Sequence, residues 1–158
     1  MLLKSKTCCF TGHRVLPKDK ILEIQERVEK EIIKLIEKGV IYFGVGGALG
    51  FDTIAELTIL KLKKLYPQIK LILVLPCNHQ TYHWSELDIF IYNYILSQSD
   101  KIVYTSKVYY NGCMQKRNRH LVENSKYCIC YLEYKNSGTF YTVNYAHKKG
   151  LEIININF

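Results

Sequence analysis

Six short apolar runs that alternate with helix-length segments constrain the fold of this chain more than any other feature. The runs cover residues 7–10, 40–45, 70–75, 101–104, 127–132 and 152–156. Runs of this kind are typical of parallel strands covered by helices on both faces. Segments with helical periodicity lie between them, at residues 18–38, 53–66, 86–97, 113–124 and 139–149. The alternation predicts an α/β fold, a single doubly wound, three-layer Rossmann-like domain over residues 1–158 with a mainly parallel sheet.

The composition is that of a soluble globular protein, because 48% of the 158 residues are hydrophobic and 23% are charged. No apolar run reaches the roughly 18 residues that a membrane-spanning helix needs, and residues 1–6 lack the apolar core of a signal peptide. Cys8, Cys9, Cys128 and Cys130 lie inside strand runs, where reduced cysteine packs as a small hydrophobic residue. We therefore expect a cytoplasmic protein with no disulfide framework and no membrane partner.

A glycine-rich turn follows the second strand run and leads directly into a helical segment. It reads Gly46-Gly47-Ala48-Leu49-Gly50-Phe51-Asp52. Glycine allows a ligand to approach the backbone, and the free N–H groups at a helix start favour an anion. The spacing matches neither the GxGxxG fingerprint nor a Walker A loop. The turn predicts a phosphate site, and the alternative is a tight strand–helix connection that binds nothing.

Other loops at the ends of strand runs carry similar groups. Ligands of open α/β sheets bind outside the carboxyl ends of the strands, so these loops are expected to form one site. Three of the four arginines, Arg14, Arg117 and Arg119, lie in or beside them, and arginine is suited to bidentate contacts with phosphate. This collection of groups predicts a nucleotide site, with phosphate on N–H groups and arginine and a base against an aromatic ring.

The chain resembles the YpsA-like family of the SLOG superfamily, which is named for the SMF/DprA and Lonely-guy proteins. The resemblance rests on motifs that follow one another in family order between residues 6 and 156. They are Thr11-Gly12-His13-Arg14, the glycine-rich turn with Glu56, Gln80 with Trp84, Lys116-Arg117-Asn118, and Ser137-Gly138-Thr139 followed by Tyr145-Ala146. The resemblance implies a Rossmann-like domain that binds a nucleotide or an NAD- or ADP-ribose-derived ligand and acts as a sensor or regulator.

The residues expected to contact such a ligand come from all of these motifs. Glycines would hold phosphate, Asp52 and Glu56 would accept hydrogen bonds from ribose hydroxyls, and Trp84 would stack on the base. Alternatives stay open: Asp52 could cap its own helix, Arg14 could pair with an acidic neighbour, and Trp84 could be a core or lid residue. The expected contacts are Thr11, Gly12, His13, Arg14, Gly46, Gly47, Ala48, Gly50, Asp52, Glu56, Gln80, Trp84, Arg117, Asn118, Ser137, Gly138 and Thr139.

Two other functions remain open from the sequence. Lonely-guy phosphoribohydrolases carry a Gly-Gly-x-Gly-Thr-x-x-Glu motif, and here Thr142 stands where that motif has its glutamate. Hydrolysis of a nucleotide or of its N-glycosidic bond would then depend on another carboxylate, such as Asp52 or Glu56. The other open function is single-stranded nucleic-acid binding, as in DprA-type relatives, through tyrosines interleaved with basic residues.

We assign no catalytic residue, and no certain cofactor beyond the nucleotide-type ligand. Cys77, His79 and His83 have metal-ligand character but lack a fourth ligand at a plausible spacing, so we expect no metal site. A nucleotide-type small molecule is the expected partner, and a homo-oligomer is compatible with the sequence.

Overall fold

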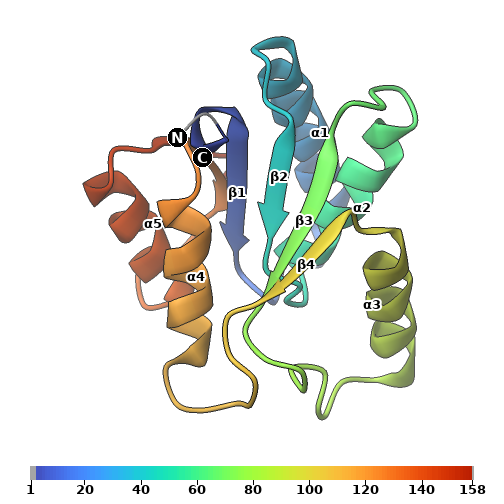
Figure 1. Cartoon of the computed structure of the whole chain (residues 1–158), viewed down its shortest axis with the longest axis vertical. Helices are drawn as coiled ribbons and strands as arrows, with labels where there is room; N and C mark the ends of the chain where they lie inside the picture. The colour runs from blue at the N-terminus through green and yellow to red at the C-terminus, as the bar shows by residue number, and fades with distance from the viewer. Residues whose placement is uncertain (1–2, 158) are drawn as a thin grey trace.

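Six parallel strands form the centre of the structure, a computed structural model that describes residues 3–157 (Figure 1). Their order across the sheet is β4-β3-β2-β1-β5-β6, and each neighbouring pair is parallel. The sequence prediction of an α/β Rossmann-like fold is confirmed. The strands are β1 (Thr7–Gly12), β2 (Tyr42–Val45), β3 (Lys70–Leu75), β4 (Lys101–Tyr104), β5 (Tyr127–Tyr131) and β6 (Glu152–Asn155).

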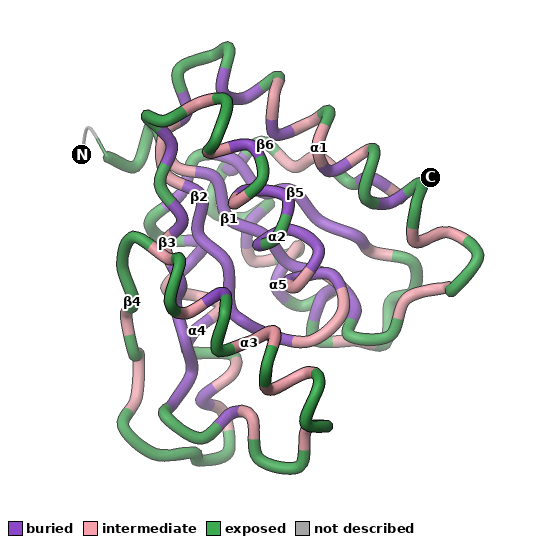
Figure 2. Tube along the Cα trace, turned by 90° about the vertical axis from the view of Figure 1, so that its right-hand side faces the viewer, coloured by how far each residue is buried: buried purple, intermediate pink, exposed green. Residues whose placement is uncertain are grey.

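Five α-helices cover the two faces of this sheet. Side chains from α1, α2 and α3 pack against one face in a large apolar cluster, and side chains from α4 and α5 pack against the other. Figure 2 shows the buried segments running through the middle of the molecule between these layers. The helices are α1 (Ile21–Glu37), α2 (Phe51–Lys63), α3 (Glu86–Gln98), α4 (Cys113–Glu123) and α5 (Gly138–Lys148), with short 3-10 helices at Lys4–Lys6 and Lys18–Lys20.

Alternation along the central strands explains this division of the core. In β1, Cys9 points to the α4–α5 face, whereas Cys8 and Phe10 point to the other. In β5, Cys128 and Cys130 likewise join the α4–α5 face. All six cysteines are free and buried, and the four in strands, Cys8, Cys9, Cys128 and Cys130, have the small hydrophobic role expected of them. No helix within residues 3–157 is long and apolar enough to cross a membrane.

Most element boundaries differ from the sequence prediction by a few residues, and two of these differences concern the expected ligand contacts. The first strand continues to Gly12, because Thr11 and Gly12 pair with Cys130 and Tyr131 of β5. Pairing between distant segments cannot be read from local periodicity, so these residues were expected in a loop. The second helix begins at Phe51, which places Asp52 in its first turn.

The order of the strands creates a crevice at one place on the carboxyl edge of the sheet. From β1 the chain proceeds outward through β2 and β3 to β4, and it then returns to place β5 on the other side of β1. The loops after β1 and β5 therefore lead to opposite faces of the sheet and separate from each other. Such a switch point is where open α/β sheets bind their ligands.

Gly50 allows the loop after β1 to lie against the start of α2. Its backbone has φ +76° and ψ −116°, a conformation that residues with a Cβ rarely adopt. A Cβ at this position would lie 2.7 Å from the carbonyl oxygen of His13 and would overlap the Arg14 carbonyl group. The next residue, Phe51, donates its N–H to the His13 carbonyl at 3.1 Å. The absence of a Cβ at Gly50 therefore allows the loop after β1 and the start of α2 to pack backbone against backbone.

We predict that Gly50→Ala lowers the free energy of unfolding by at least ~2 kcal/mol, because it adds both backbone strain and overlap. Urea unfolding followed by circular dichroism measures the change. Gly138→Ala is the matched control, since a Cβ there would find no atom within 4 Å. Equal stability of the two variants would contradict this account of the turn.

Candidate functional site

A cavity of about 310 Å³ lies at the switch point between β1 and β5. Four segments that are distant in the sequence form its wall: the end of β1 with the following loop, the start of α2, the first turns of α4 and the start of α5. The lining residues are Phe10, Thr11, Gly12, His13, Arg14, Val15, Ala48, Asp52, Met114, Gln115, Arg117, Asn118, Tyr134, Ser137, Gly138 and Thr139. Residues from four of the five sequence motifs thus line one cavity, and the Gln80–Trp84 motif does not.

The first turn of α5 supplies the part of this wall that is suited to an anion. Ser137 is the N-cap, and its Oγ accepts a hydrogen bond from the Phe140 N–H at 3.1 Å. The first N–H groups of a helix have no acceptor within the helix, and the helix dipole adds positive potential there. The first turn of α5 has no acidic residue, so nothing in it competes with a bound anion.

Arg14 brings a positive charge to the same cavity. The side chain is exposed, and its Nη2 lies 3.8 Å from the Met114 sulfur, which is a weak acceptor. Within residues 3–157 no carboxylate forms an ion pair with Arg14, although the Arg14 charge acts on the buried Asp52 carboxyl group and opposes the rise of its pKa. Its guanidinium is available to a phosphate.

Arg117 lines the cavity but is committed to the protein. The guanidinium donates through Nη1 to the Gly46 carbonyl oxygen, and through Nε to the Asn118 Oδ1 at 2.7 Å. The residue is buried, and burial lowers the pKa of Arg117 while the nearby Asp52 carboxylate opposes that effect. Arg117 therefore serves to hold the glycine-rich turn and to compensate buried negative charge.

Asp52 and Glu56 form a buried carboxyl pair beside Arg117. The Asp52 Oδ2 accepts the Ala48 N–H at 3.2 Å, so the side chain braces the turn and is not the N-cap, which is Gly50. Burial raises the pKa of Asp52, although Arg117 opposes it. Burial raises the pKa of Glu56 well above its usual value, and the Asp52 charge adds to this. Within the described chain the Glu56 Oε2 is buried without a hydrogen-bond partner, which favours the neutral acid.

The Gly46–Gly47 part of the turn faces protein side chains. A Cβ on Gly46 would lie 2.7 Å from the guanidinium carbon of Arg117, and one on Gly47 would lie 2.8 Å from the Gln80 Nε2. The Gln80 Nε2 donates to the Gly46 carbonyl at 3.4 Å and to the Tyr92 hydroxyl at 3.2 Å. These two glycines are therefore needed for the close approach of Arg117 and Gln80, and neither lines the cavity.

Trp84 packs with the side chains that hold the glycine-rich turn in place. Its ring meets Tyr92 edge-on, with centroids 5.3 Å apart and an interplanar angle of 83°, so it packs against the residue that holds Gln80. Trp84 does not line the cavity, in keeping with the core or lid alternative. The expected contacts that lie outside the cavity wall are Gly46, Gly47, Gly50, Glu56, Gln80 and Trp84, whereas the other eleven line it.

Tyr134 is a cavity residue that the motifs did not indicate. It follows β5 and stacks on His13 with ring centroids 4.0 Å apart and an interplanar angle of 1°. It is 50% exposed, so it presents aromatic surface beyond the His13 contact. Its position three residues before the Ser137 cap was the available signal, but it stood among many tyrosines that core packing could explain.

His13 fastens the loop after β1 to the loop after β5. Its Nε2 accepts the Glu133 backbone N–H at 2.9 Å, so the ring proton is on Nδ1 in the neutral form. Burial lowers the pKa of His13, and the Glu133 charge opposes this only in part. The two loops that border the cavity are therefore joined by a neutral histidine.

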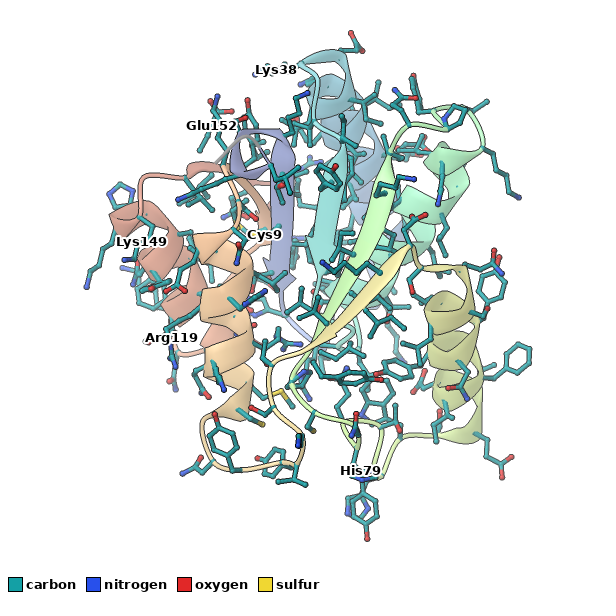
Figure 3. All side chains as sticks on the ribbon, viewed as in Figure 1. Cys9, Lys38, His79, Arg119, Lys149 and Glu152 are labelled. Atoms are coloured by element: carbon teal, nitrogen blue, oxygen red, sulfur yellow. The ribbon has the colours of Figure 1, made fainter. Side chains whose placement is uncertain are left out.

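Metal binding has no support in the described part of the chain, where no group of three His, Cys, Asp or Glu side chains is placed to hold an ion. Figure 3 shows the labelled His79 in the loop after β3 at the bottom of the view, well below the labelled Cys9 in the middle of β1.

Comparison with known proteins shows which family this chain is similar to. A model of the YspA SLOG family (YpsA) matches residues 11–157. A UPF0398 protein from Halalkalibacterium halodurans is 33% identical over 132 residues, which cover 82% of this chain and 70% of the relative. The SPbeta prophage-derived protein YoqJ of Bacillus subtilis is 30% identical over 141 residues, which cover 81% of this chain and 82% of the relative. A UPF0398 protein from Brevibacillus brevis is 28% identical, and the match spans 63% of its length.

Two solved structures share the fold. The chain is similar to DNA processing protein A from Helicobacter pylori, with a TM-score of 0.67, 19% identity, and coverage of 96% of this chain and 66% of that one. The Helicobacter pylori protein binds single-stranded DNA. DprA from Streptococcus pneumoniae gives a TM-score of 0.66 at 17% identity, with coverage of 96% of this chain and 50% of that chain.

We predict that Arg117→Ala lowers the free energy of unfolding by about 3–5 kcal/mol, because it leaves buried carboxyl groups without their cation and removes one of the two donors to the Gly46 carbonyl. Arg14→Ala, which removes the same charge from an exposed position, is expected to change it by no more than about 0.5 kcal/mol. Urea unfolding of both variants measures the difference. Equally small losses would show that Arg117 has no such structural role.

His13 is predicted to lower the free energy of unfolding as the pH falls from about 7 to 5, whereas the raised pKa of Glu56 acts in the opposite sense over the same range. The folded-state pKa of His13 lies below its ordinary value of 6.5. The unfolded chain therefore binds the proton first, and stability is lost as the pH drops from that value through the folded pKa. His13→Gln keeps an acceptor for the Glu133 N–H without titrating, so the free energy of unfolding of the wild type should fall relative to that of the variant between these pH values. An unchanged slope in the variant would rule out His13 as the cause.

Proposed function

The chain belongs to the YpsA family of SLOG proteins, and on that premise we propose that its switch-point cavity binds a nucleotide or an NAD- or ADP-ribose-derived ligand. The single observation that carries the proposal is the meeting of an exposed Arg14 with the start of α5 in one cavity. Both favour an anion of phosphate chemistry. The chain spans only about two thirds of some relatives, so the proposal concerns this domain.

The cavity wall supports one arrangement of such a ligand. The phosphate groups lie between Arg14 and the N–H groups of Gly138 and Thr139. Asp52 reaches the cavity from α2 and accepts from ribose hydroxyls. The base stacks on the exposed part of Tyr134, which takes the aromatic role expected of Trp84. Rigid aromatic surface of this kind stacks on any base, so it gives affinity with little choice between bases.

A sensor or regulator fits the site better than a hydrolase. Thr142, at the position of the Lonely-guy glutamate, is buried, and its Oγ1 donates to the Gly138 carbonyl at 3.0 Å. Departure of a base builds positive charge on the ribose, which a carboxylate stabilises and a hydroxyl does not. Asp52 is the carboxyl group that lines the cavity, and it is already engaged by the Ala48 N–H. The six free cysteines are in keeping with a cytoplasmic sensor.

The test is a calorimetric titration with ADP-ribose, NAD and nucleoside mono- and diphosphates. We predict that at least one binds, and that Arg14→Ala weakens it roughly tenfold or more, because a charge-assisted hydrogen bond contributes about 1.5–3 kcal/mol.

Arg119→Ala is the matched control for this titration. Arg119 lies on α4 (labelled in Figure 3) and does not line the cavity, yet its loss changes the net charge equally. Equal weakening in both variants would show that affinity depends on the net charge of the chain and not on a contact with Arg14. Unchanged affinity in Arg14→Ala would show that the ligand does not contact Arg14 and would contradict the proposed site.

Single-stranded DNA is the second candidate, because the structural relatives from Helicobacter pylori and Streptococcus pneumoniae are DNA processing proteins. Exposed aromatic side chains near α4, Tyr109 and Tyr110, and the half-exposed Tyr134 offer stacking surface, and the chain carries a formal charge of +8. We predict that the nucleotide binds more tightly than an oligothymidylate at about 0.15 M salt. Fluorescence anisotropy over a series of salt concentrations measures the oligonucleotide. Tighter oligonucleotide binding, with a steep linear fall of log affinity against log salt, would show that single-stranded DNA and not a nucleotide is the ligand.

A further inference from the structure

The outer face of α3 carries a stripe of exposed apolar side chains. Leu87, Phe90 and Tyr94 are 67%, 72% and 49% exposed and lie at steps of three and four residues, so they share one side of the helix. The helix lies at the outer side of the molecule (Figure 1). Only Ile95 among its residues is fully buried. A helix with apolar residues on both its inner and outer sides has an unpartnered face.

The edge strand β4 also exposes apolar side chains, on the face of the sheet that α3 covers. Ile102 and Tyr104 of β4 are 39% and 48% exposed. They pair with Leu73 and Leu75 of β3, which face the same side of the sheet as α3. The β4 strand is the last in the sheet order, so its outer backbone edge has no neighbouring strand in the described chain. Contiguous apolar surface of more than a few hundred Å² marks an interaction site on most soluble proteins.

Charge indicates which partner this surface fits. The chain carries a formal charge of +8, yet α3 has no lysine, arginine or histidine, and its acids Glu86 and Asp88 are confined to the first turn. The other four α-helices of residues 3–157 each carry lysine or arginine. Two copies of a protein this basic repel each other at most faces. At α3 they can meet without placing cations together, whereas an acidic partner would be drawn to the basic faces instead.

We propose that α3, with Ile102 and Tyr104 at its margin, is the interface of a symmetric homodimer. A two-fold axis near Phe90 pairs the helices antiparallel, so that Phe90 contacts the partner's Phe90 and Leu87 contacts the partner's Tyr94. Aromatic side chains bury roughly 150–250 Å² each. The three aromatic rings of the stripe and its margin are 48–72% exposed in the single chain, so they can still bury roughly half of that area and supply the centre of an interface whose standard size is ~800 Å² per partner.

Sedimentation of the whole chain over a wide range of concentrations tests the proposal. We expect the mass of two chains, falling to one on dilution. Phe90→Glu should sediment as a monomer at every concentration, because it places two carboxylates together at the axis. Circular dichroism should show an unchanged fold, since Phe90 is exposed in the single chain.

Leu22→Glu is the matched control, because Leu22 is 76% exposed on α1, away from this surface. It should remain a dimer. A wild-type chain that is monomeric at every concentration would overturn the proposal, and so would a dimer that Leu22→Glu dissociates and Phe90→Glu does not.

A cross-linking pair gives an independent readout. The six native cysteines are buried, so an introduced thiol reacts alone. With a thiol oxidant, Phe90→Cys should form a covalent dimer through the axis, and Leu22→Cys should not. Efficient cross-linking of Leu22→Cys without that of Phe90→Cys would place the interface elsewhere.

Discussion

The pairing of β5 with β1 is the constraint on which the site depends. Five residue pairs join the two strands, from Cys8 with Tyr127 to Gly12 with Tyr131. This pairing brings the chain back across the sheet after β4, and it holds apart the loops that follow the two strands. The crevice between them is then closed at its base by the His13–Glu133 hydrogen bond and the stacking of Tyr134 on His13. The cavity, the start of α5 and Arg14 all owe their positions to this return of the chain.

A second layer of polar contacts holds the wall of the cavity from behind. Arg117 and Gln80 both donate to the Gly46 carbonyl, and Asp52 braces Ala48. Buried charges of this kind stabilise a fold only when they are paired, so the turn, the arginine and the two carboxyl groups depend on one another. Burial raises the pKa of Glu56, whereas the Arg117 charge opposes the rise for Asp52, so Asp52 is the carboxyl group through which this layer would meet a ligand. A ligand bound there would be coupled to the pKa values of the whole layer.

Most of the fold could be predicted from the sequence, because the central strands β1, β2, β3 and β5 are largely buried and helices such as α1 have one-sided apolar periodicity. The runs at residues 70–75 and 101–104 became β3 and β4 with the same bounds. The glycine-rich turn was correctly placed between a strand and a helix, but Gly46 and Gly47 serve the approach of Arg117 and Gln80. That role depends on side chains from 34 and 71 residues further along the chain, which local spacing cannot show. Tyr134 was missed for the same reason, because its contact with His13 joins two loops that only the return of β5 brings together.

The measurement that tests the central claim most directly is the change of amide chemical shifts in NMR spectra on addition of ADP-ribose and of the nucleotides. We predict that the largest changes fall on Arg14 and on Ser137, Gly138 and Thr139, with the Tyr134 ring signals among the side chains affected. The indole signal of Trp84, the single tryptophan, should change little, because Trp84 lies behind the cavity wall. Changes that centre on Trp84, Gly46 and Gly47, and that leave the start of α5 unaffected, would contradict this assignment and move the ligand away from the crevice between β1 and β5.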